Sequence, residues 1–408
     1  MTSVQLYCGG GEFEDIALAN LFARLELSRA ALADPFAAER IEVIGDVSKR
    51  LLADRRTLNR PAIAYFAHWT RPAALRDLAR RFEATSPPDV VCVPRGVALH
   101  IPPKNVETIF LFSWTLAYLA GNANLVRLPA QVDSVMLEVI DLLVERLRAT
   151  QQQTEYFVRY PADDAINAAL CGAADARLVW GGDAKVAAFE KFPLRNGGKA
   201  IWFGDRYSYA LISGEALEAI DGAELKRLAR NVFVDIFTFD QMGCSSPHKI
   251  YIHGDRRRHR QVVAALADAV QEEAARSGTN ISASHSIRKI AEAFALAAEN
   301  PGADVAFRSG ELTTVVLPAP RRAEDRLGGG FLTVEFIDDL NEVIAQIRSK
   351  HQTITHYGIK KDALSEIARR GGRFGLSRIV PVGQALDFDA VWDGYDLLRE
   401  LTRSIRLR

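Results

Sequence analysis

The sequence predicts an α/β protein built on parallel sheets, and two observations carry that prediction. From Val90 on, short runs rich in β-branched and aromatic residues alternate with windows in which apolar residues recur every three to four positions. This alternation is typical of right-handed crossovers that connect parallel strands through helices. The length of 408 residues suggests two or three domains at roughly 100–200 residues each.

The expected domains follow from the places where the pattern changes. Residues 1–85 show helical periodicity until Thr85-Ser86-Pro87-Pro88 interrupts it, and we expect them to belong to the first domain. Residues 86–212 form a first α/β block and residues 213–380 a second, with linker-like stretches at 277–284 and 318–330. Residues 381–408 are expected to return to the first domain or to lie in an oligomer interface. The strands expected in the first block are Val90–Val93, Val97–Ile101, Leu125–Leu128, Tyr156–Arg159, Arg177–Trp180, Ala200–Phe203 and Tyr209–Ile212.

Charge and cysteine content exclude several classes of function. The chain has 51 Lys and Arg against 51 Asp and Glu, which disfavours nucleic-acid binding and membrane-surface binding because both need clustered positive charge. The four cysteines lack zinc-ligand spacing, so we expect no metal site. Scattered cysteines and an N-terminus without a basic and then apolar run predict a cytoplasmic protein.

One uncharged segment resembles a membrane span in composition. Residues Thr108 to Val126 carry no charge, but the apolar part ends at Ala120, before Gly121. About 13 helical residues reach ~20 Å, short of the ~30 Å hydrocarbon core. We therefore expect a buried helix and no membrane span. The aromatic residues of this segment either belong to the core or line an acyl tunnel; they are Phe110, Phe112, Trp114 and Tyr118.

Cys244 is the cysteine whose surroundings suggest chemistry. It lies in Gln241-Met242-Gly243-Cys244-Ser245-Ser246-Pro247, between a long helical stretch and an expected strand. Gly before it and Ser-Ser-Pro after it suit a tight turn that exposes a thiol. A lone cysteine is usually structural, and a nucleophilic one must ionise to the thiolate.

A second feature is the run from Pro94 to Asn105, in which a strand leads into a proline-rich turn before a helix. Asn105 can be the N-cap of that helix. Alternatively, its side-chain amide can donate a hydrogen bond to an oxyanion.

Together these features resemble the aldehyde dehydrogenase superfamily. Its P-x-G-V-x-x-x-I-x-P-W-N run matches Pro94 to Asn105, except that Lys104 replaces Trp. Gly121-Asn122, a strand ending at Arg127 where the family has Lys, and Gly181-Gly182 after a strand follow in order. Within the superfamily the chain is most similar to the LuxC-type acyl-CoA reductases, or fatty-acid reductases. The segments that carry this likeness are Val179–Asp183, Phe203–Ser208, Gln241–Pro247, Gln352-Thr353 and Trp392–Leu398.

The resemblance implies a Rossmann-like cofactor domain at residues 86–212 and a catalytic α/β domain at residues 213–380. It implies that Cys244 is the nucleophile and that Asn105 polarises the carbonyl. It also implies that the cofactor is NADPH, with NADH as the alternative, since Arg127 suits a 2′-phosphate. The positions that would bind this cofactor are Pro103, Arg127, Gly181 and Gly182.

The departures from the family pattern bear on the reaction. Hydrolytic members use a Glu in E-L-G-G-K, whereas the segments that could stand there, Arg195–Lys199 and Trp202–Arg206, have no carboxylate at that position. Without such a base, water is poorly activated. The E-x-F-G-P motif is also missing, and Arg326–Phe331 lies in its neighbourhood.

The resemblance and these departures together favour reduction of an acyl-CoA thioester to an aldehyde through a thioacyl-cysteine. The alternatives are reductive release from an acyl-carrier protein, a hydrolytic aldehyde dehydrogenase, and a non-catalytic subunit. The resemblance further implies a homo-oligomer, dimer or tetramer, and allows for an acyl-activating partner enzyme.

Overall fold

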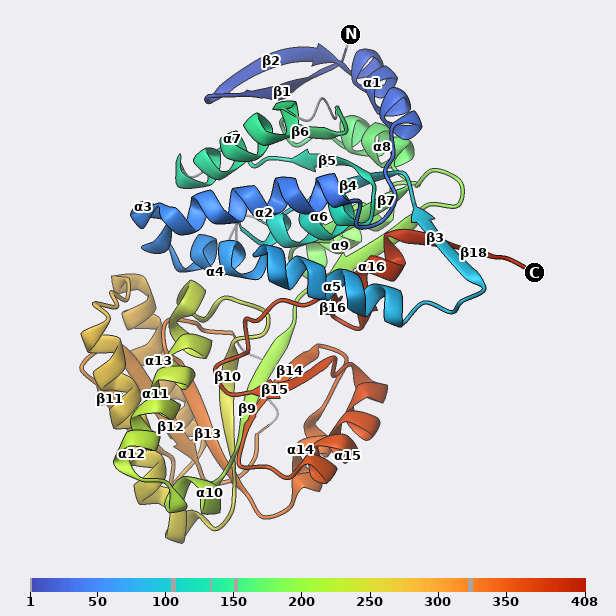
Figure 1. Ribbon diagram of the computed structural model, residues 1–408. Helices are drawn as coiled ribbons and strands as arrows, with labels where there is room; N and C mark the ends of the chain where they lie inside the picture. Colours follow the sequence, from blue (N-terminus) through green and yellow to red (C-terminus); the bar gives the residue numbers. More distant parts are fainter. Residues whose placement is uncertain (1, 104–107, 133, 150–152, 322–325) are drawn as a thin grey trace. The chain divides into compact units, whose positions relative to one another are not determined.

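The computed structural model describes residues 2–103, 108–132, 134–149, 153–321 and 326–408 (Figure 1). The chain divides into two compact units, and each is described by itself below. Unit 1 comprises Met1–Gly204 together with Phe388–Arg408, and unit 2 comprises Asp205–Asp387. The last residues of the chain therefore return to the unit in which it begins.

Unit 1 contains a mostly parallel sheet in the order β2-β1-β6-β5-β4-β7-β8. The hairpin strand β1 is antiparallel to its neighbours, and the pairs from β6 to β8 are parallel. The chain builds β4, β5 and β6 to one side and then β7 and β8 to the other, so the topological switch point lies between β4 and β7. The strands are β1 (Ser3–Gly9), β2 (Glu12–Ala17), β4 (Val97–Ile101), β5 (Ala123–Arg127), β6 (Glu155–Arg159), β7 (Ala176–Trp180) and β8 (Lys199–Phe203).

Helices cover both faces of this sheet. On one face α1, α8 and α9 share a core with strand residues such as Leu99, Leu125 and Val158. On the other, α6 contacts β4 and β5 and is itself contacted by α2. The helices of unit 1 are α1 (Leu18–Ala30), α2 (Ala38–Ala53), α3 (Arg55–Leu58), α4 (Pro61–Trp69), α5 (Pro72–Ala84), α6 (Ile109–Leu119), α7 (Ser134–Ala149), α8 (Asp164–Ala173), α9 (Asp183–Glu190) and α16 (Leu397–Glu400).

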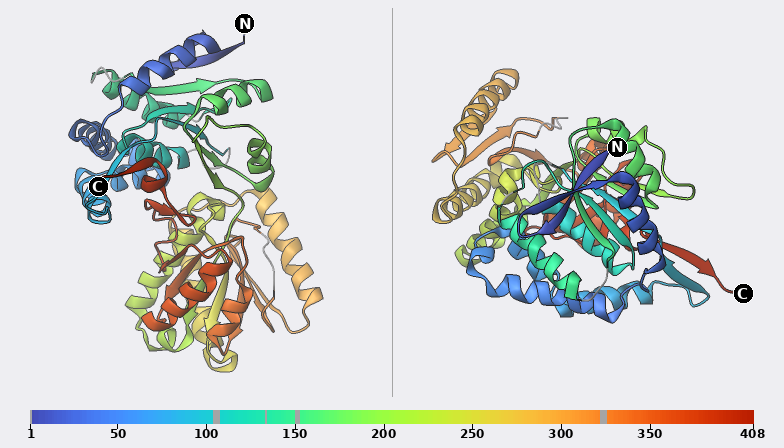
Figure 2. Two further views of the ribbon diagram at one scale, coloured as in Figure 1. Left: turned by 90° about the vertical axis from the view of Figure 1, so that its right-hand side faces the viewer. Right: turned by 90° about the horizontal axis from the view of Figure 1, so that it is seen from above.

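Two small strand pairs complete unit 1. The antiparallel ribbon of β3 (Val90–Pro94) and β18 (Thr402–Arg406) leaves the rest of this unit (Figures 1 and 2). The other pair is β16 (Val391–Trp392) with β17 (Tyr395–Asp396).

The helical prediction for residues 1–85 is wrong at its start, where β1 and β2 form a hairpin. Gly9, Gly10 and Gly11 form the turn with φ of 91°, 64° and 82°, a region that residues with a side chain rarely adopt. The Asp141 carboxylate fixes this turn by accepting from the Gly10 N–H at 2.7 Å and from the Tyr7 hydroxyl at 2.6 Å. The periodicity of the later segments does correspond to helices.

Two strands expected in the first sheet lie elsewhere. Residues 209–212 belong to β9, which pairs with β10 and β14 of unit 2. Residues 90–93 pair with β18 instead of joining the sheet. In both cases the residue pattern identified a strand correctly but carried no information about its partner.

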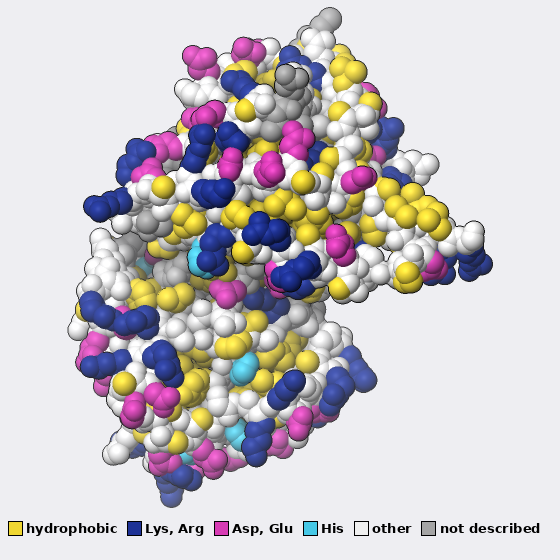
Figure 3. Space-filling view, in the orientation of Figure 1, with side chains coloured by type: hydrophobic (Ala, Val, Ile, Leu, Met, Phe, Trp, Pro, Cys, Tyr) yellow, Lys and Arg dark blue, Asp and Glu magenta, His cyan; other side chains and the backbone are white. Residues whose placement is uncertain are grey.

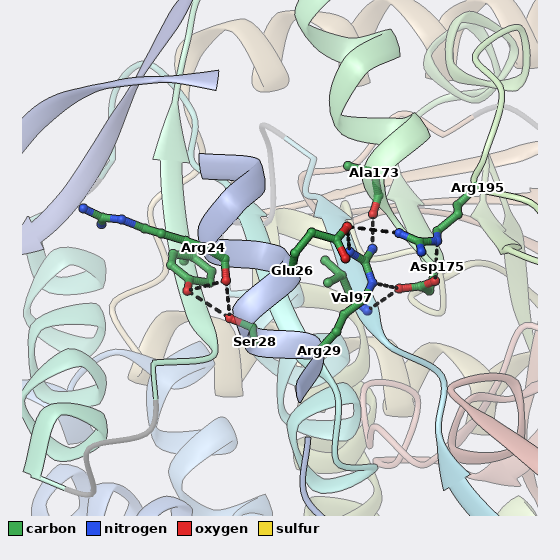
Figure 4. A network of polar contacts seen from close by, with 9 residues as sticks. Arg24, Glu26, Ser28, Arg29, Val97, Ala173, Asp175 and Arg195 are labelled. Atoms are coloured by element: carbon green, nitrogen blue, oxygen red, sulfur yellow. Dashed lines mark hydrogen bonds and ion pairs between the residues drawn. The ribbon is translucent and has the colours of Figure 1, made fainter. Parts of the chain in front are cut away.

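Asp175, directly before β7, fixes the start of β4 (Figure 4). Its Oδ2 accepts from the Val97 N–H at 2.8 Å and from Arg29 Nε at 2.9 Å. A Cβ on Gly96 would lie 2.1 Å from the same oxygen. Glycine is therefore required at position 96 because the carboxylate occupies the space of a side chain.

Asn122 joins β4 to the C-terminal segment. Its Oδ1 accepts from the N–H groups of Arg95 and Gly96 at 2.8 and 3.0 Å, and its Nδ2 donates to the carbonyls of Ala117 and Leu401 at 3.1 and 2.9 Å. The Gly-Asn pair thus has a structural role in this unit.

Unit 2 contains a second sheet in the order β11-β12-β13-β10-β9-β14-β15, parallel except for the β11–β12 pair. All parallel strands begin at the same edge, which places the segments before β9, β10, β13 and β14 together. The strands are β9 (Tyr207–Ser213), β10 (Pro247–His253), β11 (Asp304–Arg308), β12 (Leu312–Leu317), β13 (Phe331–Ile337), β14 (His351–Tyr357) and β15 (Arg378–Pro381).

The helices of unit 2 form separate cores on the two faces of its sheet. Ile250 and Ile252 pack beneath α11 and α12, while Tyr209 and Tyr251 point to the side of α14 and α15. Helix α13, orange in Figure 2, lies along the outside of the unit and packs on β12. The helices are α10 (Gly214–Ala219), α11 (Gly222–Phe237), η1 (Thr238–Gln241), α12 (Arg256–Arg276), α13 (Ala283–Glu299), α14 (Leu340–Gln346), α15 (Lys361–Gly371) and η2 (Gly372–Phe374).

The uncharged segment forms α6 and then most of β5, and α6 is buried apart from Ile109 at its first position. None of the helices in the described ranges is both long and apolar enough to cross a bilayer. Side chains of both charges are interspersed on the face shown in Figure 3, as the balanced composition suggests.

Candidate active site

Cys244 lies in a tight turn directly before β10, the central strand of unit 2. The Ser246 N–H donates to the Gly243 carbonyl at 3.1 Å and closes the turn. Cys244 is half-buried, whereas Ser245 and Ser246 after it are fully buried. Within this turn the Cys244 side chain is therefore the one that is partly accessible, as the motif suggested. We call residues 239–247 the nucleophile loop.

Gln241 holds the nucleophile loop to two strands. Its Oε1 accepts from the N–H groups of Gly330 and Phe331 at 3.0 and 3.1 Å. Its Nε2 donates to the carbonyls of Pro247 and Phe331 at 2.8 and 2.9 Å. This fully buried amide thus uses both its acceptor and its donors on the starts of β10 and β13. The sequence motif contained Gln241 but did not reveal this role.

The loop enters the turn through an unusual backbone conformation. Phe239, Asp240 and Gln241 have φ of 56°, 53° and 63°, in the left-handed region. Each such residue with a side chain costs roughly 1–2 kcal/mol. The four hydrogen bonds of Gln241 offset that strain, so the loop conformation depends on them.

Ser208, at the start of β9, supports the turn from a third strand. Its hydroxyl donates to the Cys244 carbonyl at 2.8 Å and accepts from the Thr353 N–H at 3.1 Å. Three of the segments that carried the family resemblance therefore meet at one edge of the sheet, namely those containing Ser208, Cys244 and Thr353.

The glycine run before β13 packs against the nucleophile loop. The Gly329 N–H donates to the Asp240 carbonyl at 3.0 Å. A Cβ on Gly328 would lie 2.9 Å from the Met242 sulfur. From its composition, the stretch at 318–330 is expected to be linker-like. The part of it from Arg326 onward instead supports the candidate site. Composition alone could not show this, because a glycine-rich linker and a close backbone contact look the same in sequence.

His248 follows Cys244 by four residues and lies on β10, as expected of a strand residue. It is 4% exposed, its ring stacks on Tyr207 at 5.7 Å between centroids, and no described residue hydrogen-bonds its Nε2. Burial, with a smaller effect of Arg326, lowers the pKa of His248 to about 3. The imidazole is therefore neutral near pH 7.

The predicted cofactor residues lie in unit 1, at the carboxyl ends of three adjacent strands. Pro103 follows β4, Arg127 ends β5, and Gly181 and Gly182 follow β7. This is the edge, next to the switch point, at which open parallel sheets bind nucleotides. Asn105 and Lys104 lie outside the described residues.

This edge suits a phosphate-bearing cofactor in its chemistry. Gly182 is the N-cap of α9 and has no side chain to cap the helix, so that helix terminus favours an anion. The Arg127 guanidinium stacks over the Tyr160 ring at 4.4 Å and has no acidic partner within the parts of the chain that the structure describes. The buried Trp180 Nε1 has no hydrogen-bond partner among the residues whose positions are given.

The aromatic residues of α6 belong to the core of unit 1. Trp114 and Tyr118 are fully buried and stacked at 5.3 Å, and Trp114 Nε1 donates to Glu155 at 2.7 Å. Phe112 packs in an aromatic cluster with Phe388 at 4.8 Å. These contacts favour the core alternative over the acyl tunnel.

The histidines, cysteines and carboxylates form no metal-ligating group of three or more among the residues whose positions are given. The four cysteines, all of which lie within the described residues, form no disulfide. Cys244 in the nucleophile loop and the phosphate-compatible edge of unit 1 are therefore the candidate functional features.

Comparison with known proteins agrees with this arrangement. A family model described as "Acyl-CoA reductase (LuxC)" matches residues 73–404. The chain belongs to this family and is an enzyme of the acyl-CoA reductase type, a class that reduces acyl groups to aldehydes. A search of curated proteins found no match.

Solved structures of the aldehyde dehydrogenase superfamily share the fold. An oxidoreductase from Marinobacter aquaeolei is 16% identical with a TM-score of 0.65, covering 99% of this chain and 94% of its own. An NAD-dependent aldehyde dehydrogenase from Sinorhizobium meliloti is 14% identical with a TM-score of 0.67, covering 99% and 90%. An indole-3-acetaldehyde dehydrogenase solved with NAD+ is 14% identical with a TM-score of 0.65, covering 97% and 92%. The predicted aldehyde-dehydrogenase-like fold is thus confirmed.

Proposed function

We propose that the protein catalyses NADPH-dependent reduction of an acyl-CoA thioester to an aldehyde through a thioacyl intermediate on Cys244. The observation that carries the proposal is the half-buried cysteine at the start of β10, held in a strained turn, in a member of the acyl-CoA reductase family. A fixed turn supports nucleophilic attack because it orients the sulfur before the substrate arrives.

The chain's own residues would act as follows. The Cys244 thiolate attacks the thioester carbonyl carbon, and the carbon–sulfur bond to CoA breaks as the CoA thiolate leaves. Asn105 and the Cys244 N–H would stabilise the oxyanion, and such a donor typically contributes ~3–4 kcal/mol. Collapse of the reduced thiohemiacetal then releases the aldehyde and restores the thiolate.

The cofactor supplies the hydride that reduces the thioacyl carbonyl. We assign the cofactor to the carboxyl edge of the unit 1 sheet, where the main chain at Pro103, Gly181 and Gly182 would lie close to it. Arg127 would lie at the adenosine ribose of the cofactor. The solved relatives include proteins described as NAD-dependent or bound to NAD+. Arg127 leads us to favour NADPH over NADH, because a guanidinium pairs well with a 2′-phosphate.

A hydrolytic outcome is disfavoured by the residues in place of the water-activating Glu. In one candidate segment the position is held by Trp202, and the Arg177 guanidinium lies over the Trp202 ring, 4.8 Å from the centroid of that ring. In the other, Arg195 pairs with Glu26 at 3.1 Å. Neither supplies a carboxylate that could activate water to cleave the thioacyl enzyme.

The test follows NADPH oxidation with a panel of acyl-CoA chain lengths and, in parallel, with an acyl-carrier protein. Wild-type protein should form aldehyde, and Cys244→Ala should form none, while Cys8→Ser serves as the matched thiol control. Without NADPH, mass spectrometry should detect one acyl group on Cys244 and one equivalent of free CoA. Acyl-dependent NADPH oxidation by Cys244→Ala would overturn the proposal. Faster turnover of the carrier-bound acyl group would identify the carrier as the substrate.

We also propose that the chain is a cytoplasmic homo-oligomer, a dimer or tetramer. Four cysteines that form no disulfide suit a reducing compartment. The β3–β18 ribbon exposes Val91, Ile405 and Leu407 at 44%, 48% and 58%, and a two-stranded ribbon is marginally stable by itself. Light scattering should give a mass of two or four chains, and truncation after Leu401 should reduce it to one.

A further inference from the structure

Unit 2 contains a pocket of about 250 Å³ beside the nucleophile loop. Arg288 of α13 and Arg321 and Arg326 before β13 line it, together with Glu292 and His248. Three guanidinium groups around one small pocket, with one carboxylate, require an explanation, because like charges repel unless something compensates them.

Among the residues that the structure describes, these charges are poorly compensated. Arg288 has no ion pair within the described part of the chain. The acidic partner of Arg321 is Glu299 at 3.7 Å, a side chain that is 62% exposed. Arg326 is 4.0 Å from Asp205, at the limit of an ion pair. His248 is neutral, so it adds no charge of its own. Within the described part of the chain, the guanidinium groups that line the pocket therefore outnumber the carboxylates.

The pocket is also held in place by buried contacts. Arg326 Nη2 donates to the Met242 carbonyl of the nucleophile loop at 2.6 Å, while its buried Nε has no partner in the described part of the chain. Buried Lys249 donates to the Arg321 carbonyl at 2.5 Å and pairs with the fully buried Glu335 at 2.8 Å. The main chain at Arg321 and the guanidinium of Arg326 are thus fixed before any ligand arrives.

Two buried polar atoms at the pocket have no hydrogen-bond partner among the described residues. They are Arg326 Nε and His248 Nε2, the latter on a side chain that is only 4% exposed. Buried polar atoms are normally hydrogen-bonded, and an unsatisfied one suggests an absent ligand or water. Arginine forks match the oxygens of phosphate groups in geometry as well as charge.

We propose that this arginine pocket binds the diphosphate of a nucleotide co-substrate and so anchors that molecule beside Cys244. Arg326, which lines the pocket, contacts the carbonyl of Met242, two residues before the nucleophile, so a ligand bound by Arg326 would lie close to the nucleophile loop. CoA and NADPH both carry a diphosphate. The identity of the two co-substrates rests on the proposed function, but the diphosphate chemistry of the pocket does not.

The experiment measures binding without turnover, in the full-length Cys244→Ala protein. Calorimetry would give the Kd of inorganic pyrophosphate, of CoA and of NADPH. The variants are Arg288→Gln and the Arg288→Gln/Arg321→Gln pair, both of which leave the Arg326 contact with the loop intact. Arg257→Gln is the matched control, because Arg257 is an exposed arginine of α12 outside the pocket.

We expect the double variant to weaken pyrophosphate binding about tenfold or more, as loss of charge-assisted hydrogen bonds does. The binding of either CoA or NADPH should weaken to the same degree, while the binding of the other nucleotide should not change. The nucleotide whose binding weakens is the one that occupies the pocket. Its Kd should also rise with salt concentration. Acyl-pantetheine, which has no phosphate, should bind equally well to wild type and variants.

Three results would overturn the inference. Pyrophosphate and both nucleotides could bind the double variant as tightly as wild type. Alternatively, Arg257→Gln could weaken binding as much as the pocket variants, which would indicate a nonspecific effect of positive charge on the protein surface. The third is an equal loss of acyl-pantetheine, which would indicate a structural defect. Because the protein cannot turn over, failure of the reduction chemistry would not alter any of these measurements.

Discussion

The two sheets of this chain present their candidate functional residues at opposite edges. In unit 1, Arg127 ends β5 and Gly181 follows the carboxyl end of β7. In unit 2, Cys244 precedes the amino end of β10. The carboxyl edge of a parallel sheet offers helix N-termini, so backbone and glycine suffice to attract an anion. At the amino edge the loop conformation rests on particular side chains, chiefly Gln241 and Ser208.

The prediction with the largest effect tests whether the nucleophile loop depends on Gln241. Gln241→Leu should leave two N–H groups and two carbonyls without their partner, and each unsatisfied group costs about 1–3 kcal/mol. We expect the free energy of unfolding of unit 2 to fall by about 4 kcal/mol, a value at the upper end for one substitution. Urea unfolding followed by the fluorescence of this unit's tyrosines would measure it.

The control for Gln241 is Gln261→Leu on the exposed surface of α12. The free energy of unfolding of Gln241→Glu should lie between those of the two Leu variants, because Glu keeps the acceptor for the Gly330 and Phe331 N–H groups but loses the donors. If Gln241→Leu were as stable as Gln261→Leu, the Gln241 side chain would not be what holds the nucleophile loop at the amino edge of the sheet. The alkylation rate of Cys244 should change with Gln241 and not with Gln261.

The second prediction concerns unit 1, where a buried histidine lies within the sheet. His100 is fully buried between Ser113 at 3.2 Å and Asn124 at 2.9 Å. Burial lowers its pKa from 6.5 to about 4. Unfolding restores the ordinary pKa, so the unfolded chain binds more protons between these values. Stability should therefore fall as the pH falls from about 6.5 to about 4.

His100→Gln removes this titration while keeping a hydrogen-bonding side chain. The loss of unfolding free energy between pH 7 and pH 5 should shrink by about 2 kcal/mol, since one pKa unit corresponds to about 1.4 kcal/mol. Urea titrations of both proteins at the two pH values would measure the difference. An identical pH dependence in both would show that His100 is not buried in its neutral form.

The third prediction tests the carboxyl edge through Arg127. Arg127→Ala should raise the KM for NADPH about tenfold and that for NADH much less, because the guanidinium is assigned to the 2′-phosphate. Arg159→Ala is the control: it ends the neighbouring strand β6, and its guanidinium also stacks on an aromatic ring, that of Phe13 at 3.8 Å. Equal losses for both cofactors would remove the reason to favour NADPH.

The same contrast explains what could be predicted from the sequence. The alternating pattern predicted the parallel sheets and most of the strands, because helix and strand periods are local properties. The glycines and Cys244 could be recognised as motifs. The partners of Gln241 and Ser208 could not, since Phe331 and Thr353 lie far along the chain and only the sheet order brings them to the loop. The arginine pocket was missed for the same reason.

The smallest expected effect again concerns the amino edge. Ser208→Ala removes the donor to the Cys244 carbonyl and leaves the Thr353 N–H without an acceptor. We expect about 1 kcal/mol less unfolding free energy and a several-fold lower kcat with KM unchanged, because the turn would be less well positioned. Ser365→Ala on α15 removes a comparable hydroxyl from the surface and should change neither. If Ser208→Ala raised KM and left kcat intact, Ser208 would act on substrate binding, and Gln241 alone would position the nucleophile loop.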